Sequence, residues 1–442
     1  MKKLLPLLIG AALGSLSSSV WADSLAEIYD LAKQNDPQLL SVQAKRDAAF
    51  EAVTSSRSTL LPQINLTAGY NINRSDIDPR DSDKLSAGIN FSQELYQRSS
   101  WITLDNAEKS ARQADAAYAA TQQGLILRTA QAYFEVLKAQ DNLEFVRAEK
   151  AAVARQLEQT KQRFEVGLSA ITDVHDAQAQ YDGVLADEVL AENSLTNSYE
   201  ALREITGQEH KNLNVLDTKR FSASRSNASA ETLIEEAQEK NLSLLSARIT
   251  KDIAKDNISL ASSGHLPSLT LDGGYNYGNE TNSNNGSVLN NSGDDYTTND
   301  FSLGLNLVVP LYTGGNTTSQ TKQAEFNYVS ASQDLEATYR GVVKEVRAQN
   351  NNINASIGAL RAYEQSVVSA RSALEATEAG FDVGTRTIVD VLDATRRLYD
   401  ANKNLSNARY NYILSVLQLR QAVGTLNEQD VLDVDAGLIA KK

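Results

Sequence analysis

An internal duplication is the feature that most constrains how this chain can fold. Residues 60–71 match residues 265–276, and both segments contain Leu-Pro and end on Gly-Tyr-Asn. Residues 164–207 match residues 381–424 without a gap, and both of these segments begin with Phe-x-Val-Gly and end on glycine. Chance similarity seldom extends over 44 residues. The chain is therefore predicted to contain two copies of one structural unit.

The two copies differ in length between these blocks. Residues 85–90 and 95–96 match residues 301–306 and 311–312, but the second copy has 11 additional residues before this match. The additional residues fall within Asn279–Asn299, which is rich in Asn, Ser, Gly and Thr. This segment is predicted to form a long polar loop.

The first 22 residues have the pattern of a secretory signal peptide. Two lysines precede an apolar run, Leu4–Leu16, and Val20–Ala22 has the small-x-small pattern of a cleavage site. The mature chain is expected to begin near Asp23, in the cell envelope. The sequence contains no cysteine, which excludes disulfides and a lipid-carrying cysteine.

Composition argues against several functional classes. After the signal, no uninterrupted apolar stretch reaches the roughly 18 residues that a membrane-spanning helix needs, so an inner-membrane protein is not expected. Without Lys2 and Lys3 the chain has 40 basic and 56 acidic residues, a net charge of −16 that disfavours nucleic acid as a partner. His175, His210 and His265 are scattered without metal-ligand spacing. No nucleophile motif or phosphate loop is evident, so we expect no enzyme, cofactor or metal.

Four segments alternate between apolar and polar side chains, the period of β-strands. They are predicted at residues 62–73, 84–96, 266–278 and 300–312. Their polar positions carry Asn, Ser, Thr and Gly more than Lys and Glu, which favours an outer-membrane barrel, with lipid outside and water inside, over a soluble β-sandwich. Four strands cannot close a barrel, and lipid tolerates no open sheet edge. The chain is therefore predicted to oligomerise, and three copies would supply twelve strands.

Each strand pair precedes a long segment with apolar residues at three-four spacing, the pattern of a supercoiled helix. Each helix would be about 90 Å long, enough to cross a periplasm. The helices end near Val166-Gly167 and Val383-Gly384, where glycine can adopt a left-handed cap. Thr387 and Asp390 then have capping-box spacing, and Asp173 lies in the first turn of the other return helix. Each copy is thus predicted to end in a helical hairpin.

The predicted fold is a mixed α and β chain whose trimer forms an outer-membrane β-barrel continuous with a long periplasmic α-helical barrel. The predicted parts are a signal peptide (1–22), a first repeat (23–225) with its helical hairpin at about 102–207 and the tip near 167–172, a second repeat (226–430) with its hairpin at about 318–424 and the tip near 384–389, and a C-terminal tail (431–442). The apolar seams of the long helices are predicted to run from Thr129 to Phe164 and from Leu335 to Phe381.

Several motifs resemble those of the TolC family of outer-membrane efflux proteins. These motifs are Val383–Ala394, Ala408–Tyr412, Gly167–Val174 and the Leu-Pro openings of the strand blocks. The resemblance covers nearly the whole mature chain and implies a homotrimeric channel in contact with outer-membrane lipid. It also implies a periplasmic adaptor (membrane fusion) protein and an inner-membrane pump of RND, ABC or MFS type as partners. Such assemblies expel drugs, bile salts and, in type I secretion, unfolded proteins.

The resemblance further implies that coiled hairpins close the periplasmic entrance. Asp390 and Asp393 would form acidic rings at the pore constriction. Phe381 stands where the family commonly has tyrosine, and a phenyl ring cannot donate a hydrogen bond, so one closing link is expected to differ. Matched by motif position, the gate links would involve Gln162, Thr172 and Asp173 of the first hairpin and Phe381 and Arg386 of the second. The tip residues expected to face the adaptor are Val166, Gly167, Leu168, Val383, Gly384 and Thr385.

These residues also admit simpler roles. Asp390 and Asp393 lie three residues apart near a helix N-terminus, where each can offset the helix dipole by about 0.3–1 kcal/mol. In a trimer, six carboxylates around a narrow axis would instead bind cations. Arg386 can be an ordinary surface charge, but its counterpart in the first copy is Ser169. The two tips therefore differ where a gate would need asymmetry.

Two other architectures compete with this prediction. A trimeric autotransporter adhesin also supplies four strands per chain to a shared barrel, but its strands form one C-terminal block. A soluble fibrous coiled coil would leave the four alternating strands unexplained. The separated strand pairs, each leading into helices, favour the duplicated channel.

Overall fold

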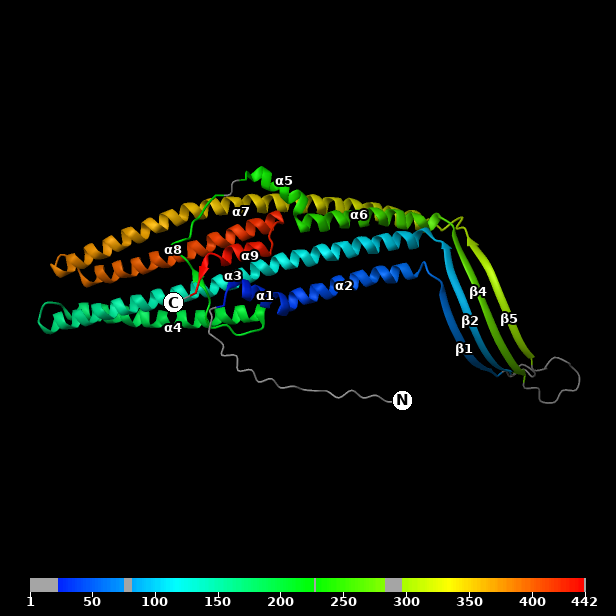
Figure 1. The fold of residues 1–442 in the computed structure, drawn as a ribbon, viewed down its shortest axis with the longest axis horizontal. Helices are drawn as coiled ribbons and strands as arrows, with labels where there is room; N and C mark the ends of the chain where they lie inside the picture. The colour runs from blue at the N-terminus through cyan, green and yellow to red at the C-terminus, as the bar shows by residue number, and fades with distance from the viewer. Residues whose placement is uncertain (1–22, 75–81, 226–227, 283–295, 441–442) are drawn as a thin grey trace, which may run out of the picture.

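The computed structural model describes residues 23–74, 82–225, 228–282 and 296–440. They form an elongated molecule with a four-stranded sheet at one end and two long helical hairpins reaching to the other (Figure 1). Shorter helices lie around the middle of the molecule. The predicted signal peptide, 1–22, lies outside the described residues.

Both repeats contain two helices, two strands and a helical hairpin in that order. The first repeat consists of α1 (Leu25–Asn35), α2 (Pro37–Ser58), β1 (Gln63–Asn73), β2 (Ser82–Tyr96), α3 (Arg98–Glu165) and α4 (Ile171–Thr206). The second consists of α5 (Ala230–Lys240), α6 (Leu242–Ser262) with its 3-10 extension η1 (Ser263–His265), β4 (Ser268–Asn282), β5 (Tyr296–Val308), α7 (Asn316–Asp382) and α8 (Ile388–Val423). The remaining elements are β3 (Val215–Leu216), α9 (Glu428–Asp435) and β6 (Leu438–Ile439).

The sheet joins the two repeats edge to edge. Its strand order is β1-β2-β4-β5, with every neighbouring pair antiparallel, so β2 of the first repeat pairs with β4 of the second. One cross-strand row contains only apolar and aromatic side chains, whereas the adjacent row is small or polar. The first row is Leu66, Ile89, Tyr275 and Phe301, and the second is Thr67, Gly88, Asn276 and Asp300. The sheet therefore has one apolar and one polar face, as the alternation predicts.

The strands differ from their predicted limits in the second repeat. β4 and β5 continue into the predicted polar loop, Asn279–Asn299, because Glu280 still pairs with Tyr296 and Asn282 with Ser82. The rest of that loop lies outside the described residues. β5 ends at Val308 instead of near residue 312, since Pro310 has no N–H to donate to a ladder. β4 begins at Ser268, shortly after η1, the 3-10 turn that extends α6.

The helix pair that opens each repeat is absent from the sequence-based prediction. The sequence signals that could have predicted these helices are the capping residues at their N-termini. Ser24 and Glu27 form a capping box at the start of α1, and Ser229 caps α5. Asp36 and Asn241 accept first-turn N–H groups at the starts of α2 and α6. Side-chain oxygens at these positions satisfy N–H groups that have no partner within the helix.

The C-terminal segment is more ordered than the predicted tail, 431–442. α9 crosses the predicted limit at residue 430, because Asn427 and Asp430 form a capping box at its start. Arg420 near the end of α8 forms an ion pair with Asp430. β6 then pairs with β3, the strand between the repeats. The end of the described chain is thus tied to the middle of the molecule.

The long helices span both halves of the helical region, while their neighbours change midway. α3 packs against α2 and α6 near the sheet and against α4 and α8 toward the tips. α7 likewise packs against α6 and then α8. α2 and α4 follow each other nearly end to end, as do α6 and α8 (Figure 1). The apolar seam predicted for α3 is correct for Val136, Leu143 and Val153, which are buried. It is wrong at its end, where Phe164 is exposed.

The two end-to-end junctions use equivalent cap residues in different ways. At the first junction, Asp36 accepts two hydrogen bonds from the Arg128 guanidinium at 3.0 and 3.1 Å. At the second, the Asn241 side chain caps α6 and also donates to the Ala422 carbonyl near the end of α8, at 2.8 Å. Gly424 has φ +89° and lies so close to the Lys240 carbonyl that a side chain there would collide with backbone. Asp36 thus links the start of α2 to the middle of α3, whereas Asn241 links the start of α6 to the end of α8.

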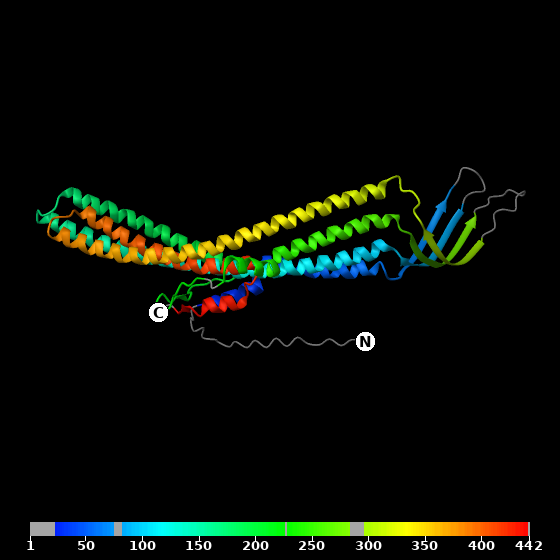
Figure 2. The ribbon, with the colours of Figure 1, turned by 90° about the horizontal axis from the view of Figure 1, so that it is seen from above.

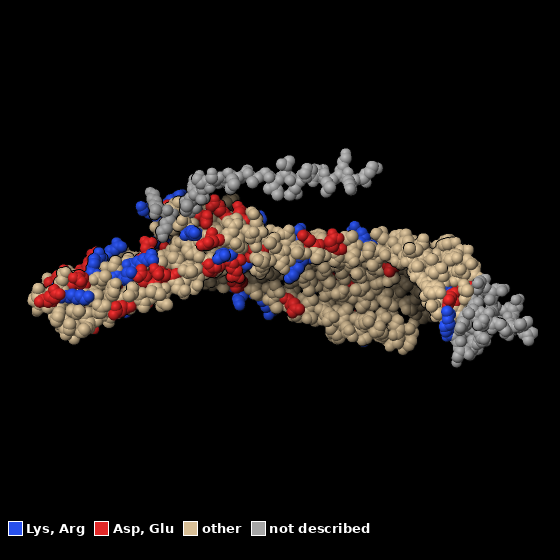
Figure 3. Space-filling model, turned by 90° about the horizontal axis from the view of Figure 1, so that it is seen from below, with Lys and Arg blue, Asp and Glu red and all other residues tan. Residues whose placement is uncertain are grey.

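The principal core lies at the middle of the molecule. α1, α3, α4, α8 and α9 contribute to it, with Tyr133 and Phe134 fully buried at an edge-to-face angle of 86°. The Tyr133 hydroxyl donates to the Asn214 carbonyl at 2.7 Å. α1 and α9 project from one side of the curved helical layer (Figure 2). The layer is hollowed on the opposite side (Figure 3).

Charge is distributed unevenly along the molecule. In the face shown in Figure 3, Lys, Arg, Asp and Glu gather over the helical hairpins and the middle, whereas the region toward the sheet is almost free of them. Within the described part of the chain, no helix is both long and apolar enough to cross a membrane. Large apolar residues are nevertheless exposed on the strands, including Leu66 and Phe301, each 77% exposed. A single copy thus leaves an apolar sheet face uncovered.

Replacing Arg128 with methionine tests the first junction. Asp36, which is 2% exposed, would lose its bidentate partner and remain buried, so we expect the free energy of unfolding to fall by about 1–3 kcal/mol. Thermal melting followed by circular dichroism measures the change. Arg340→Met is the matched control, because the Arg340 side chain is 77% exposed in a local pair with Glu336. Equal melting temperatures for the two variants would contradict the prediction.

Candidate functional site

The two hairpin tips turn through the same backbone motif. Gly167 and Gly384 have φ values of +76° and +80°, the left-handed conformation that glycine adopts without strain. The next residue in each tip donates its N–H back into the helix, Leu168 to the Arg163 carbonyl and Thr385 to the Gly380 carbonyl, both at 2.8 Å. These bonds satisfy the last carbonyls of α3 and α7. The predicted glycine caps are therefore correct.

The return helices start at different caps. Thr387 and Asp390 form the predicted capping box at α8: Thr387 accepts the Asp390 N–H, and the Asp390 carboxylate accepts the Thr387 N–H and hydroxyl, both at 2.9 Å. These hydrogen bonds, with the charge of Arg386, hold the pKa of Asp390 below its usual value. At α4, the Asp173 carboxylate accepts the Ala170 N–H and the Ser169 hydroxyl instead.

An apolar cluster packs the two hairpins together near the tips. The first turns of α8 contribute Ile388, Val391 and Leu392, which are almost completely buried. They pack against α3 and α4, while Phe381 from the end of α7 is half-buried at the margin. The partners from α3 and α4 are Val153, Leu157, Ala177 and Val184. The two tips thus form one body within a single chain.

Two polar contacts between the hairpins were not foreseen from the sequence. The Arg163 guanidinium of α3 lies over the Phe381 ring, 4.5 Å from its centroid, and reaches the Asp382 carboxylate at 4.0 Å. Deeper in, the Gln156 amide donates to the buried Thr395 hydroxyl at 3.0 Å. Phe381 cannot donate a hydrogen bond, but its ring face attracts the guanidinium. The only sequence signal for this pair was an arginine one residue before Phe164, the counterpart of Phe381.

Arg386 lies in the turn of the second tip, between α7 and α8. It is exposed, and its aliphatic part passes so close to Gly380 that a Cβ there would meet the Arg386 Cγ at 2.8 Å. Together with Asp390 and Asp393 it lines a groove of about 630 Å³ between α7 and α8. Asp393 also forms an ion pair with Arg396 at 3.2 Å. Both carboxylates therefore have a local partner as well as access to the groove.

The other predicted gate residues do not meet Arg386 within one chain. Gln162 is exposed and donates to Glu158 of its own helix at 3.2 Å, and Thr172 is exposed at the start of α4. Among the described residues, the Arg386 side chain makes no hydrogen bond or ion pair to Gln162, Thr172 or Asp173. Any such link would have to cross to another copy. The tip residues predicted to face an adaptor include three large apolar side chains, Val166, Leu168 and Val383, that are 69%, 71% and 75% exposed.

No group of His, Cys, Asp and Glu in the described ranges could hold a metal ion. The charged groups of the tips instead act through local caps and ion pairs.

The family model for outer membrane efflux proteins matches residues 28–208 and 233–425, one match in each repeat. The chain belongs to the outer membrane efflux protein family. It is 82% identical to the outer membrane protein TolC of Vibrio cholerae serotype O1, over 100% of both chains. It is 46% identical to TolC of Escherichia coli K12, covering 99% of this chain and 90% of that one. It is 30% identical to the alkaline protease secretion protein AprF of Pseudomonas aeruginosa, covering 100% of this chain and 92% of that one.

Solved structures of outer membrane channels have the same fold. The Campylobacter jejuni CmeC channel matches with a TM-score of 0.77 at 16% identity, covering 99% of this chain and 98% of that one. The open Neisseria gonorrhoeae MtrE channel matches with a TM-score of 0.75 at 18% identity, covering 92% of this chain and 90% of that one. This efflux protein therefore has the trimeric channel fold, a shared β-barrel continuous with a helical barrel. It lies in the outer membrane, extends into the periplasm and provides an exit duct for efflux and secretion.

Changing Asp390 to asparagine tests the capping box. The pKa of Asp390 is lowered in the folded protein, so its stabilising contribution is present above the unfolded value, near 3.8, and is lost as the pH falls through the folded value. We expect faster hydrogen exchange at the first turn of α8 in the variant at pH 7, and convergence with the wild type once the pH has fallen below the lowered pKa of Asp390. Asp382→Asn, at the end of α7, is the control. An unchanged exchange rate at pH 7 would refute the role of this cap.

Proposed function

We propose that this chain works as a homotrimeric exit duct for drugs, bile salts and unfolded secreted proteins. Relatives named for alkaline protease secretion and pyoverdine export support a wide range of cargo. The single observation that carries the trimer is the sheet: β1 and β5 each have a free edge in one chain. Unpaired backbone groups cannot face lipid, so the β1 edge of one copy must pair with the β5 edge of the next.

The partners in this proposal are a periplasmic adaptor and an inner-membrane pump of the RND, ABC or MFS type. The exposed apolar side chains at the two tips, Val166, Leu168 and Val383, support an adaptor contact at this end of the molecule. The glycine turns hold them outward, so they contribute nothing to the core of their own chain. An outer-membrane lipid annulus would cover the apolar face of the sheet.

The gate in this proposal is formed between copies. Arg386 of one chain would bind Gln162, Thr172 or Asp173 of another, and these links would hold the hairpins closed. Within each chain, the Arg163–Phe381 contact takes the position of a link to tyrosine and fixes the two hairpins to each other. Opening would then move the hairpins of one chain while the links between chains break.

Complementation tests the proposed cargo. A deletion strain that expresses this chain should recover resistance to bile salts and antimicrobials, and should recover secretion of a type I protein substrate, relative to an empty vector. Recovery of secretion alone would remove drugs and bile salts from the proposal. Recovery of neither would overturn it.

Displacing Arg386 should open the entrance. We expect Gly380→Ala, whose methyl group would collide with the Arg386 side chain, to raise single-channel conductance in the same direction as Arg386→Ala. Planar-bilayer recordings measure the conductance. Gly358→Ala is the matched control, because a Cβ at this position of α7 meets nothing within 4 Å. Wild-type conductance in both Gly380→Ala and Arg386→Ala would count against a gating role.

Neutralising the acidic pair tests the pore constriction. If Asp390 and Asp393 form carboxylate rings around the axis, their double change to asparagine should abolish block of the channel by divalent cations. Single-channel recordings with added divalent cation on the tip side measure the block. Asp400→Asn, farther along the same groove, should leave it nearly unchanged. Block that persists in the double variant would place the cation site elsewhere.

A further inference from the structure

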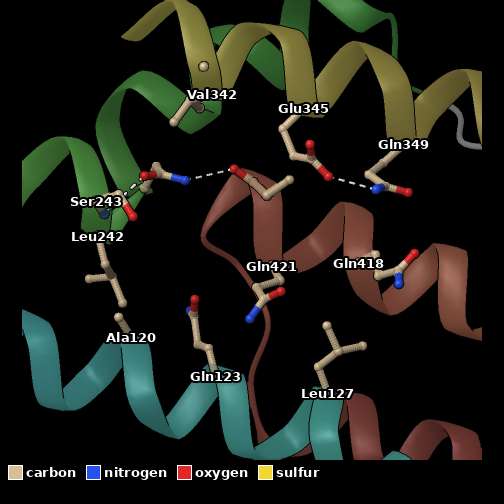
Figure 4. A pocket seen from close by; sticks show the side chains of 13 residues that line it. Ala120, Gln123, Leu127, Leu242, Ser243, Val342, Glu345, Gln349, Gln418 and Gln421 are labelled. Carbon is tan, nitrogen blue, oxygen red and sulfur yellow. Dashed lines mark hydrogen bonds between the residues drawn. The ribbon is translucent and has the colours of Figure 1, made fainter. Parts of the chain in front are cut away.

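A polar cavity lies where α8 ends and α6 begins. Its volume is about 380 Å³. Helices α3, α6, α7 and α8 surround it, and side chains from all four border the space (Figure 4). The lining residues that matter here are Leu127, Asn241, Val342, Glu345, Gln349 and Gln418.

Comparison with the first repeat shows which charged side chain is missing from this cavity. Asn241 is the counterpart of Asp36, at the offset of 205 residues, and Glu345 is the counterpart of Arg128, at the offset of 217. At the first junction these positions hold the Asp36–Arg128 ion pair. At the second junction the cation has been replaced by a carboxylate and the acid by an amide. The second repeat thus keeps an acidic group in this region and has lost the arginine.

The other lining residues are suited to a cation. Gln349 and Gln418 replace Ala132 and Ala201 of the first repeat, which brings further amide oxygens to the cavity. The lining contains no Lys or Arg. Among the described residues, Glu345 has only one polar partner, the Gln349 amide at 2.7 Å, and no ion pair. One carboxylate and several amide oxygens therefore face a space without a positive side chain.

An anion is a poorer fit for the same space. The N-terminus of α6 borders the cavity, but Asn241 already accepts the N–H groups of Ser243 and Leu244. The Gln123 amide is likewise committed, since it donates to the Gly424 carbonyl at 3.1 Å. The strongest donors are therefore used, whereas the Glu345 carboxylate retains capacity to accept.

We propose that this cavity binds an amphiphilic organic cation, a small molecule with one ammonium, amidinium or guanidinium group. The charged group occupies the place that Arg128 fills in the first repeat and hydrogen-bonds to Glu345 and the glutamine amides. The apolar part of the molecule packs on Leu127 and Val342. The volume admits a compact aromatic or aliphatic body of this kind.

The cavity opens toward the interior of the proposed duct. α5 packs on the opposite face of α7 and α8, against residues such as Val346 and Leu419. Gln418 adjoins Leu419 but lines the cavity and is not part of that packed cluster (Figure 4). The helical layer is concave on the side away from α1 and α9 (Figures 2 and 3). A free small cation therefore has access, whereas a side chain of an external partner does not; this step rests on the proposed function.

Benzamidine and benzamide provide a matched pair of probes, because they share one shape and differ in charge. We expect saturation-transfer NMR with the purified full-length trimer to show binding of benzamidine at least about tenfold tighter than benzamide. Glu345→Gln, which keeps the side-chain size, should weaken benzamidine binding by about tenfold and leave benzamide unchanged. Glu364→Gln, an exposed change on α7 outside the cavity, should have no effect.

A second variant tests the same site by placing a positive side chain in the cavity. Asn241→Asp with Glu345→Arg rebuilds the ion pair of the first junction and should abolish benzamidine binding while raising the melting temperature or leaving it unchanged. Equal binding of both probes, or full benzamidine affinity in either cavity variant, would overturn the proposal. Failure of complementation with Glu345-dependent binding intact would overturn the proposed cargo and leave the cation site standing.

Discussion

The pairing of β2 with β4 is the interaction on which the rest of the molecule depends. It joins the two repeats into one sheet, so each pair of strands gains a neighbour and only β1 and β5 remain as edges. β2 leads directly into α3 and β5 leads into α7, and these two long helices are joined by α6 near the sheet and by α8 toward the tips, each of which packs against both. The same backbone hydrogen bonds that satisfy the central strands leave the outer edges to be satisfied by other copies.

The repeats differ at the hairpin tips and around the junctions in the middle of the molecule, as well as in the length of the segment between their strands. At the tips, Arg386 of the second repeat corresponds in sequence to the small Ser169 of the first repeat. The contact between the two hairpins is the Arg163 guanidinium over the Phe381 ring. At the junctions in the middle, an Asp–Arg ion pair in one repeat corresponds to an Asn–Glu cavity in the other.

Asp390 of the second tip combines a structural role with a position on the surface of a groove. Asp390 completes the start of α8 through its capping box, and the same carboxylate borders the groove between α7 and α8. The hydrogen bonds that lower the pKa of this carboxylate also hold it in one position. A fixed, ionised carboxylate near the end of a hairpin is a suitable element for a charged constriction, because it does not have to be ordered when an ion arrives.

Much of this protein was determined by local sequence pattern. Alternation predicted the two faces of the sheet, glycine after valine predicted both left-handed caps, and Thr387 with Asp390 predicted a capping box. These features depend on neighbours a few residues away, so the sequence alone specifies them. The Arg163–Phe381 contact and the Asp36–Arg128 ion pair join residues far apart in the chain. Only the tertiary structure decided these contacts, because it sets which helices lie side by side and how their ends meet.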